Sequence, residues 1–112
     1  MSMQELQDEI VADLTIELQE DDDFSEAILA IKVKNAIREI KSARMYPKSY
    51  TEEMMISDLE TNYYSTIVNL ARYDYNQIGA EGESSHSEGD VDRTWVDRNS
   101  YFNGVIPFVK VI

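Results

Sequence analysis

The stretch SEAILAIKVKNAIREIKSARM, residues 25–45, decides the fold of this chain. Its apolar side chains recur at intervals of three and four residues, which is the repeat of an amphipathic α-helix. A wide apolar stripe of this kind predicts a helix that contacts neighbours on two sides, as a central helix of a bundle does. The stripe consists of Ile28, Ile31, Ala36, Ile40 and Ala43, broadened by Leu29, Val33 and Ile37.

Further helices are predicted on either side of this one. The segment LQDEIVADLTIEL, residues 6–18, has apolar side chains at helical spacing and predicts an amphipathic helix of about four turns. Pro47 ends the central helix, because it lacks an amide donor and restricts the residue before it. Thr51 then suits the N-cap of one long helix over residues 52–79, which Gly79 ends.

The last third of the chain changes character twice. Residues 79–91 are rich in glycine and serine, so we expect a flexible polar surface loop there, and the spacing over residues 92–102 predicts a short fourth helix. The ending VIPFVKVI, residues 105–112, is β-branched and aromatic, which is the composition of a strand. Pro107 restricts such a strand to a sheet edge, and no second strand is predicted to pair with it.

The predicted fold class is therefore mainly α: a small bundle of three to four helices over residues 1–104, with a polar loop over 79–91 and an extended, β-like docking tail over 105–112. At 112 residues the chain has room for one domain with a modest core. It lacks cysteine, which excludes disulfides and thiolate metal sites. No apolar run approaches the roughly 18 residues of a membrane span, and the acidic N-terminus does not fit a secretory signal.

Residues that could carry catalysis or bind a metal are few. His86 is the only histidine, and it stands in the polar loop without a second histidine or a cysteine beside it. The acidic run that begins at Asp21 fails as a calcium loop, because the required glycine and glutamate positions hold Glu26 and Lys32. No glycine-rich phosphate loop is found. We therefore predict no catalytic, metal-binding or cofactor-binding residues, no cofactor and no enzymatic activity.

The net charge of −12 is unevenly distributed along the chain. Residues 1–26 contain ten acidic residues and no lysine or arginine, whereas residues 27–50 contain six basic residues and the single acid Glu39. Either the acidic and basic helices pack side by side within one chain, or they form complementary surfaces through which identical copies meet. The residues for such a contact between copies are Asp13, Glu17, Lys34, Arg38 and Lys41. The overall negative charge argues against nucleic-acid binding.

Several segments together resemble a known family. They are LQDEIVADLTIEL before an acidic break, NAIREIKSARMYPKSY with its proline turn, NLARYDYNQIGAEGESSHSEGDVDRTW, and the ending IPFVKVI. In this order they resemble the small head–tail connector proteins of long-tailed bacteriophages, also called head-completion or adaptor proteins. The third segment is the most distinctive, because a helix with an Ala-Arg-Tyr run is followed by a glycine- and serine-rich region and a basic–aromatic ending.

The resemblance implies a structural virion protein and not an enzyme. Copies of such proteins form a ring, commonly of about twelve subunits, beneath the portal. The ring extends the DNA channel and docks the next connector, a stopper or the tail. The implied partners are further copies of the chain, the portal protein and a downstream component, with no membrane and no sequence-specific nucleic acid. The implied location is the head–tail interface of the virion, after assembly in the host cytoplasm.

The C-terminal tail gives a physical reason to expect a partner. Burying each large apolar side chain gains about 1.5–3 kcal/mol, and fixing each residue costs about 1–2 kcal/mol of backbone entropy. Since these sums are similar, we expect the tail to order on a neighbouring subunit or the portal by strand addition. The alternative is that the tail folds back on its own bundle. The predicted interface residues are Arg93, Trp95, Val105, Ile106, Phe108, Val109, Val111 and Ile112.

Two other classes of function remain open. The ten acids in residues 1–26 also fit a small acidic inhibitor that imitates DNA. The basic central helix and the apolar tail do not fit that class. A generic helical interaction protein is the other class.

Overall fold

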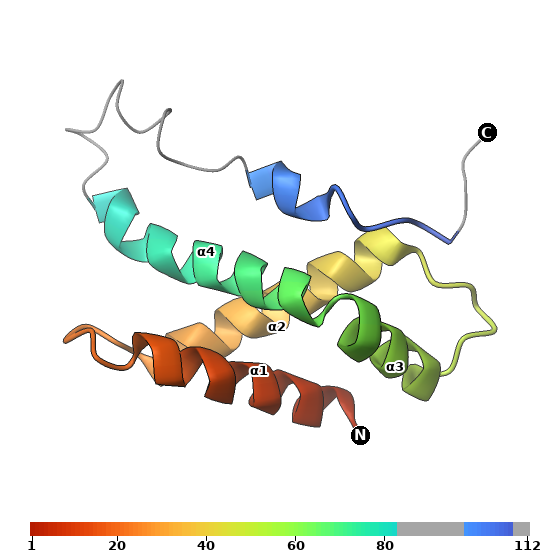
Figure 1. Ribbon diagram of the computed structural model, residues 1–112, viewed down its shortest axis with the longest axis horizontal. Coiled ribbons are helices and arrows are strands. Elements are labelled where there is room, and N and C mark those ends of the chain that lie inside the picture. Colours follow the sequence, from red (N-terminus) through yellow and green to blue (C-terminus); the bar gives the residue numbers. More distant parts are fainter. Residues whose placement is uncertain (83–97, 109–112) are drawn as a thin grey trace.

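The computed structural model describes the backbone of residues 1–82 and 98–108 and the side chains of residues 1–77 and 98–108. This part of the chain is mainly helical, which confirms the predicted fold class (Figure 1). It contains four α-helices, α1 (Met3–Leu18), α2 (Glu26–Arg44), α3 (Glu52–Asn62) and α4 (Tyr64–Gly82). A short 3₁₀ helix, η2 (Arg98–Phe102), follows, and no strand is formed in these ranges.

Local capping explains where the helices begin and end. The Ser2 hydroxyl accepts a hydrogen bond of 3.1 Å from the backbone N–H of Glu5, and the Glu5 carboxylate accepts one of 2.6 Å from the N–H of Ser2. This reciprocal capping box starts α1. Thr51 caps α3 as predicted, because its hydroxyl accepts a hydrogen bond of 3.2 Å from the N–H of Met54. Helix α2 ends at Met45, which adopts the left-handed conformation with φ of 54°.

Helix α2 is the central helix of the bundle, as its wide apolar stripe predicted. It packs against both α1 and α4, and α3 also contacts those two helices. Its position explains why its buried side chains cover a broad arc. The buried core consists of Leu6, Ile10, Leu14, Leu29, Val33, Ala36, Ile37, Ile40, Ile56, Leu59, Tyr63, Ile67, Leu70, Ala71, Tyr75 and Val105.

Two members of the predicted stripe do not belong to the core. Ile28 is 39% exposed and Ile31 is 55% exposed, while Leu29 between them is fully buried. Successive residues of an α-helix are rotated by about 100°, so Ile28 lies beyond the edge of the arc that is centred near Leu29 and Ile40, and Ile31 lies almost opposite its centre. The neighbours of α2 cover this arc and leave both isoleucines exposed.

The prediction of one long helix over residues 52–79 is wrong, because the helix breaks at Tyr63. This residue has φ of −127° and ψ of 10°, outside the helical region. Its N–H still donates to the carbonyl of Leu59, and its carbonyl accepts from the N–H of Ile67, so the break is a sharp bend. The bend directs α3 and α4 along different lines (Figure 1), and α4 continues to Gly82, beyond the predicted end at Gly79.

The C-terminal part lies along the bundle and contributes to its core. A fourth helix was predicted over residues 92–102. The structure describes residues 98–102 of this segment, and they form the 3₁₀ helix η2. The strand predicted for the tail is not formed over residues 105–108, which are irregular. Val105 is only 9% exposed and belongs to the core, so the predicted boundary between bundle and tail does not separate it from the bundle. The predicted polar loop beyond Gly82 lies outside the described residues.

Candidate functional site

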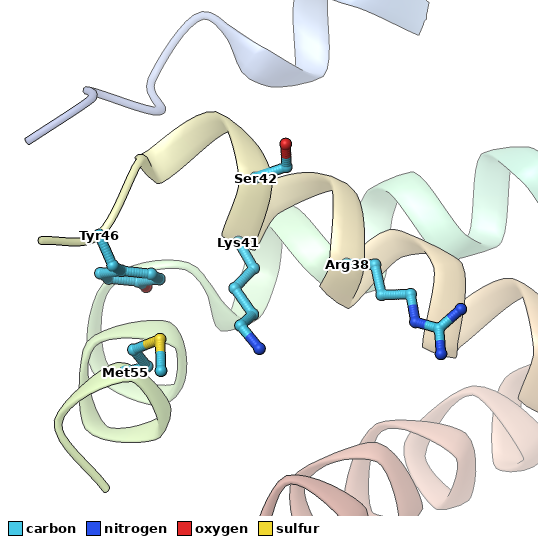
Figure 2. Close-up of a pocket in the computed structure, with 5 residues that line it drawn as sticks. All are labelled: Arg38, Lys41, Ser42, Tyr46 and Met55. Atoms are coloured by element: carbon cyan, nitrogen blue, oxygen red, sulfur yellow. The ribbon is translucent and has the colours of Figure 1, made fainter. Parts of the chain in front are cut away.

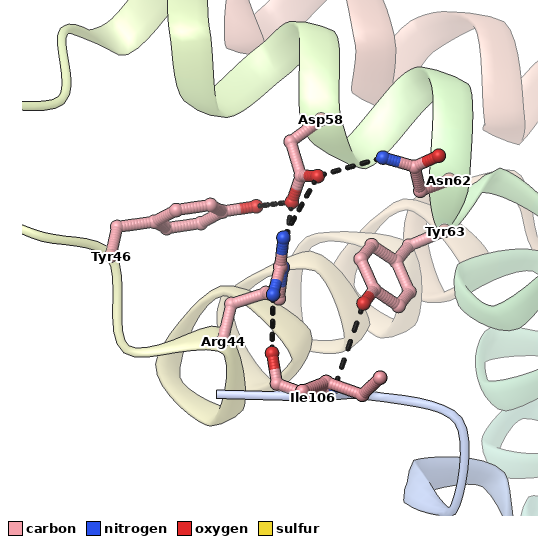
Figure 3. A network of polar contacts seen from close by, with 6 residues as sticks. All are labelled: Arg44, Tyr46, Asp58, Asn62, Tyr63 and Ile106. Atoms are coloured by element: carbon pink, nitrogen blue, oxygen red, sulfur yellow. Dashed lines mark hydrogen bonds and ion pairs between the residues drawn. The ribbon is translucent and has the colours of Figure 1, made fainter. Parts of the chain in front are cut away.

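A cluster of polar and aromatic side chains fills the junction between the end of α2, the middle of α3 and the C-terminal segment (Figure 3). Arg44 is the last residue of α2, and its Nε and Nη2 donate to the two carboxylate oxygens of Asp58 at 2.8 and 3.1 Å. The Tyr46 hydroxyl and the Asn62 amide donate to the same carboxylate at 2.7 and 2.8 Å. We call Arg44, Tyr46, Asp58, Asn62 and Phe108 the Arg44 cluster.

The electrostatics of this cluster favour a permanent ion pair. The side chains of Arg44 and Asp58 are only 12% and 10% exposed. Burial by itself raises the pKa of Asp58, but the hydrogen bonds from Arg44, Tyr46 and Asn62 outweigh it and hold that pKa below its ordinary value. Burial and the neighbouring carboxylate raise the pKa of Tyr46, so its phenol stays protonated and keeps donating. A largely covered pair whose carboxylate accepts from three side chains fixes the geometry around it.

The Arg44 cluster holds the C-terminal segment on its own bundle. The remaining guanidinium nitrogen, Nη1, donates to the carbonyl of Ile106, and the N–H of Phe108 donates to the carbonyl of Arg44 at 2.8 Å. The Phe108 ring lies 3.8 Å from the Arg44 guanidinium carbon, and its centre lies 4.9 Å from that of Tyr50. Residues 105–108 therefore fold back on their own bundle, which was the alternative prediction for the tail.

The predicted interface residues divide into three groups. Val105 is a core residue of its own chain, contrary to the expectation that it would await a partner. Ile106 and Phe108 are anchored through their backbones, yet they remain 63% and 38% exposed. Met45 and Met54 are also large apolar residues that are exposed, at 41% and 45%. The other predicted interface residues, Arg93, Trp95, Val109, Val111 and Ile112, lie outside the described residues.

The two acids predicted to contact another copy are bonded within the chain. Glu17 accepts two hydrogen bonds, of 2.6 and 3.0 Å, from the guanidinium of Arg72 on α4. Asp13 accepts a hydrogen bond from the Tyr64 hydroxyl, also on α4. These contacts join α1 to α4, so both carboxylates already have partners in their own chain.

The three predicted basic residues line a groove on the outer side of α2. One pocket of about 370 Å³ is formed by Arg38, Lys41, Ser42, Tyr46 and Met55 (Figure 2). A neighbouring pocket of about 180 Å³ is formed by Met3, Gln4, Gln7, Lys34, Ile37, Arg38 and Lys41. The two pockets share Arg38 and Lys41, and we call them together the basic groove. Within the described residues, Lys34, Arg38 and Lys41 make no ion pair.

Sequence reasoning missed the residues that anchor the C-terminal part. Arg98 of η2 donates to Asp74 of α4 at 2.8 Å and to Glu39 of α2 at 3.0 Å. The sequence did indicate that Glu39 is unusual, because it is the only carboxylate on α2 beyond the first turn of that helix. Nothing in the spacing pointed to Arg98 as its partner. The Arg44–Asp58 pair has no sequence signal either, since its members come from different helices.

Among the side chains of residues 1–77 and 98–108, no group of three or more acidic, histidine or cysteine residues could hold a metal ion. None of the helices in the described part combines the length and the apolar character needed to cross a bilayer. No protein-family description, curated protein or solved structure matches this chain.

Proposed function

We propose that this chain is a head–tail connector, or adaptor, of a long-tailed bacteriophage. In this proposal it is a structural virion protein whose copies form a ring beneath the portal, extend the DNA channel and dock the next connector or tail component. The support is the resemblance of four segments that together span most of the chain, and a small, mainly helical bundle is the fold that this resemblance implies.

The observation that best supports the proposal is that the anchored part of the tail ends at Phe108. Phe108 is tied to the Arg44 cluster by its backbone and its ring, and it is still 38% exposed. The remaining sequence, Val109-Lys110-Val111-Ile112, is apolar at three of its four positions. Four extended residues reach about 13 Å, which is enough to contact a neighbouring molecule. The Arg44 cluster thus provides a fixed base from which a short apolar segment can bind a portal or a second subunit.

The charge of the chain also suits this role. DNA must slide through a connector channel without binding to its wall, and a surface of net charge −12 repels phosphates.

The test uses capsids that carry a portal but lack this protein. Wild-type chain and a variant with Val109, Val111 and Ile112 all replaced by serine are added to such capsids, and bound density below the portal is measured by electron microscopy. The serine variant keeps the length and charge of the tail. We expect it to melt at the wild-type temperature and to lose binding, because the apolar contact is gone and the Arg44 cluster is intact. Equal occupancy by both proteins would refute the proposed role of the tail.

A DNA-mimicking inhibitor is the second candidate, and one observation favours it. Glu20, Asp21, Asp22 and Asp23 are four consecutive acids, and all of them are exposed. A row of exposed carboxylates can imitate the spacing of phosphates on a DNA strand. A competition assay separates the candidates: an inhibitor displaces DNA from a DNA-binding enzyme at stoichiometric concentration, whereas a connector subunit leaves DNA binding unchanged and joins the portal.

A further inference from the structure

The basic groove differs in charge from the rest of this acidic molecule. The chain has 22 acidic and 10 basic residues, yet no carboxylate lines either pocket of the groove. Three cationic side chains, Lys34, Arg38 and Lys41, are instead combined with the amides of Gln4 and Gln7. Amides and cations are the donors that bind carboxylates. The groove is therefore built to attract acidic groups.

Arg38 stands apart from the other arginines that the structure describes. Arg44, Arg72 and Arg98 each form an ion pair that joins two elements of the fold. Arg38 is exposed, and among the side chains of residues 1–77 and 98–108 it forms no such pair. Figure 2 shows its side chain and that of Lys41 extending away from the α2 backbone on the same side as Met55. Arginine beside apolar and aromatic side chains is characteristic of interface centres.

The complementary feature is the loop between α1 and α2. Its residues Glu20, Asp21, Asp22 and Asp23 are all exposed, and none of the four is in an ion pair within the described part of the chain. The loop is a compact turn, because the N–H of Asp21 donates to the carbonyl of Leu18 at 3.1 Å and the carbonyl of Asp21 accepts from the N–H of Phe24 at 3.0 Å. We call Glu20–Asp23 the acidic loop.

Figure 1 shows α1 and α2 as a hairpin, and the acidic loop joins the end of α1 to the start of α2. The residues that line the groove come from the first turns of α1, from α2 between Lys34 and Ser42, and from Tyr46 and Met55, so they belong to the other end of the hairpin. When the loop of one copy fills the groove of another, each pair still has one free loop and one free groove. Such a heterologous contact repeats from copy to copy, and it closes into a ring when the rotation permits.

We propose that the basic groove of one copy binds the acidic loop of the next, with carboxylates of Asp21, Asp22 and Asp23 pairing with Lys34, Arg38 and Lys41. The inference rests on the proposed ring and names the surfaces that close it. It also replaces Asp13 and Glu17 as the acidic partners, because those two side chains are bonded to α4. Nucleic acid is disfavoured as the occupant, because a long polyanion would extend beyond the groove over the rest of this acidic molecule, whereas the acidic loop is only four residues long.

Charge reversal tests this contact by light scattering after size-exclusion chromatography at low ionic strength. The double variants Arg38→Glu/Lys41→Glu (groove reversed) and Asp21→Lys/Asp22→Lys (loop reversed) should each weaken self-association by about 100-fold, because like charges then face each other. In a mixture of the two variants, the intact loop of one meets the intact groove of the other, and the reversed loop meets the reversed groove, so the two chains should assemble again in alternation. Combining all four changes in one chain should restore assembly. Lys48→Glu, the reversal of one lysine that does not line the groove, is the control and should assemble as the wild type does.

A zero-length carbodiimide cross-link gives an independent readout. In an equimolar mixture of nitrogen-15-labelled and unlabelled chains, Lys34 or Lys41 of one copy should be joined to Asp21, Asp22 or Asp23 of the other. Assembly of the groove variant equal to that of Lys48→Glu would overturn the proposal, as would cross-links confined to single chains. A wild type that stays monomeric but binds duplex DNA through Arg38 would also overturn it and assign the groove to nucleic acid. If capsid binding persists in any of these cases, the contact fails while the connector function stands.

Discussion

The guanidinium carbon of Arg44 lies 3.8 Å from the centre of the Phe108 ring, while the same guanidinium forms a two-bond ion pair with Asp58. One side chain thereby joins three parts of the chain: the end of α2, the middle of α3 and the C-terminal segment. Its planar fork has enough donors for the carboxylate and for the carbonyl of Ile106, and its face is free to stack on an aromatic ring. The following predictions depend on this junction and on the ends of α2.

Replacing Arg44 by alanine should lower the free energy of unfolding by about 3 kcal/mol, because it leaves the Asp58 carboxylate buried without its cation. The matched control is Arg72→Ala, which removes a pair of the same type from side chains that are 34% and 46% exposed. That change should cost less than about 1 kcal/mol, since an exposed pair is largely screened by water. Urea denaturation followed by circular dichroism measures both, and equal losses would contradict the buried role of Arg44.

Stability should depend on pH through Asp58. Its hydrogen bonds lower the pKa in the folded protein below the value of about 3.9 for an unfolded chain. The stabilisation from this carboxylate is thus complete above about pH 5 and is lost as the pH falls through the folded-state pKa. Asp58→Asn should be about 1–3 kcal/mol less stable than the wild type at pH 7, and the difference should narrow below about pH 4.

The control for this experiment is Asp22→Asn in the acidic loop, where the side chain is exposed. It should change the unfolding free energy at pH 7 by less than about 0.5 kcal/mol. The difference in unfolding free energy between the wild type and Asp58→Asn could instead stay constant down to pH 2. That result would show that the charge of Asp58 is not what stabilises the junction.

Val105 and Ile106 are neighbours with opposite environments, 9% and 63% exposed. Val105→Ser should destabilise the isolated chain by about 2 kcal/mol, since it removes apolar contacts and buries a hydroxyl. Ile106→Ser should change stability by less than about 0.5 kcal/mol. Thermal unfolding of the two variants measures the difference. Equal melting temperatures would mean that residues 105–108 do not fold back on the bundle in solution.

Met45 offers a stabilising substitution. It ends α2 with φ of 54°, a conformation that costs a residue with a side chain about 1–2 kcal/mol and costs glycine almost nothing. Met45→Gly should therefore raise the unfolding free energy by about 0.5–1 kcal/mol, after the greater flexibility of glycine in the unfolded chain is subtracted. Met54→Gly, at an exposed position inside α3, should lower it by about 1 kcal/mol. Two changes of the same sign would contradict the observed end of α2.

Much of the fold could be predicted from the sequence because helix signals are local. Apolar side chains at intervals of three and four residues predicted α1 and α2, and Thr51 predicted the start of α3, because a cap acts within one helical turn. The bend at Tyr63 could not be predicted in this way, since apolar periodicity continues across it. The bend arises because α3 and α4 pack along different lines, which is a property of the tertiary structure and not of the local sequence.

The candidate sites were less predictable. Lys34, Arg38 and Lys41 were expected to contact another copy, and in the structure all three line the basic groove. Asp13 and Glu17 were expected to contact another copy, yet α4 bonds both. Which acid meets which base depends on contacts between residues far apart in the chain, and the local pattern carries no information on them.

By itself, then, the sequence determined the helical class, the central place of α2 and the separation of acidic from basic segments, since each follows from interactions within a few residues. The tertiary structure alone decided which charges are used inside the chain, where the long helix bends and how residues 105–108 are held. These outcomes depend on which side chains the finished bundle brings within bonding distance, and Arg44, Asp58 and Phe108 meet only after α2 and α3 have packed.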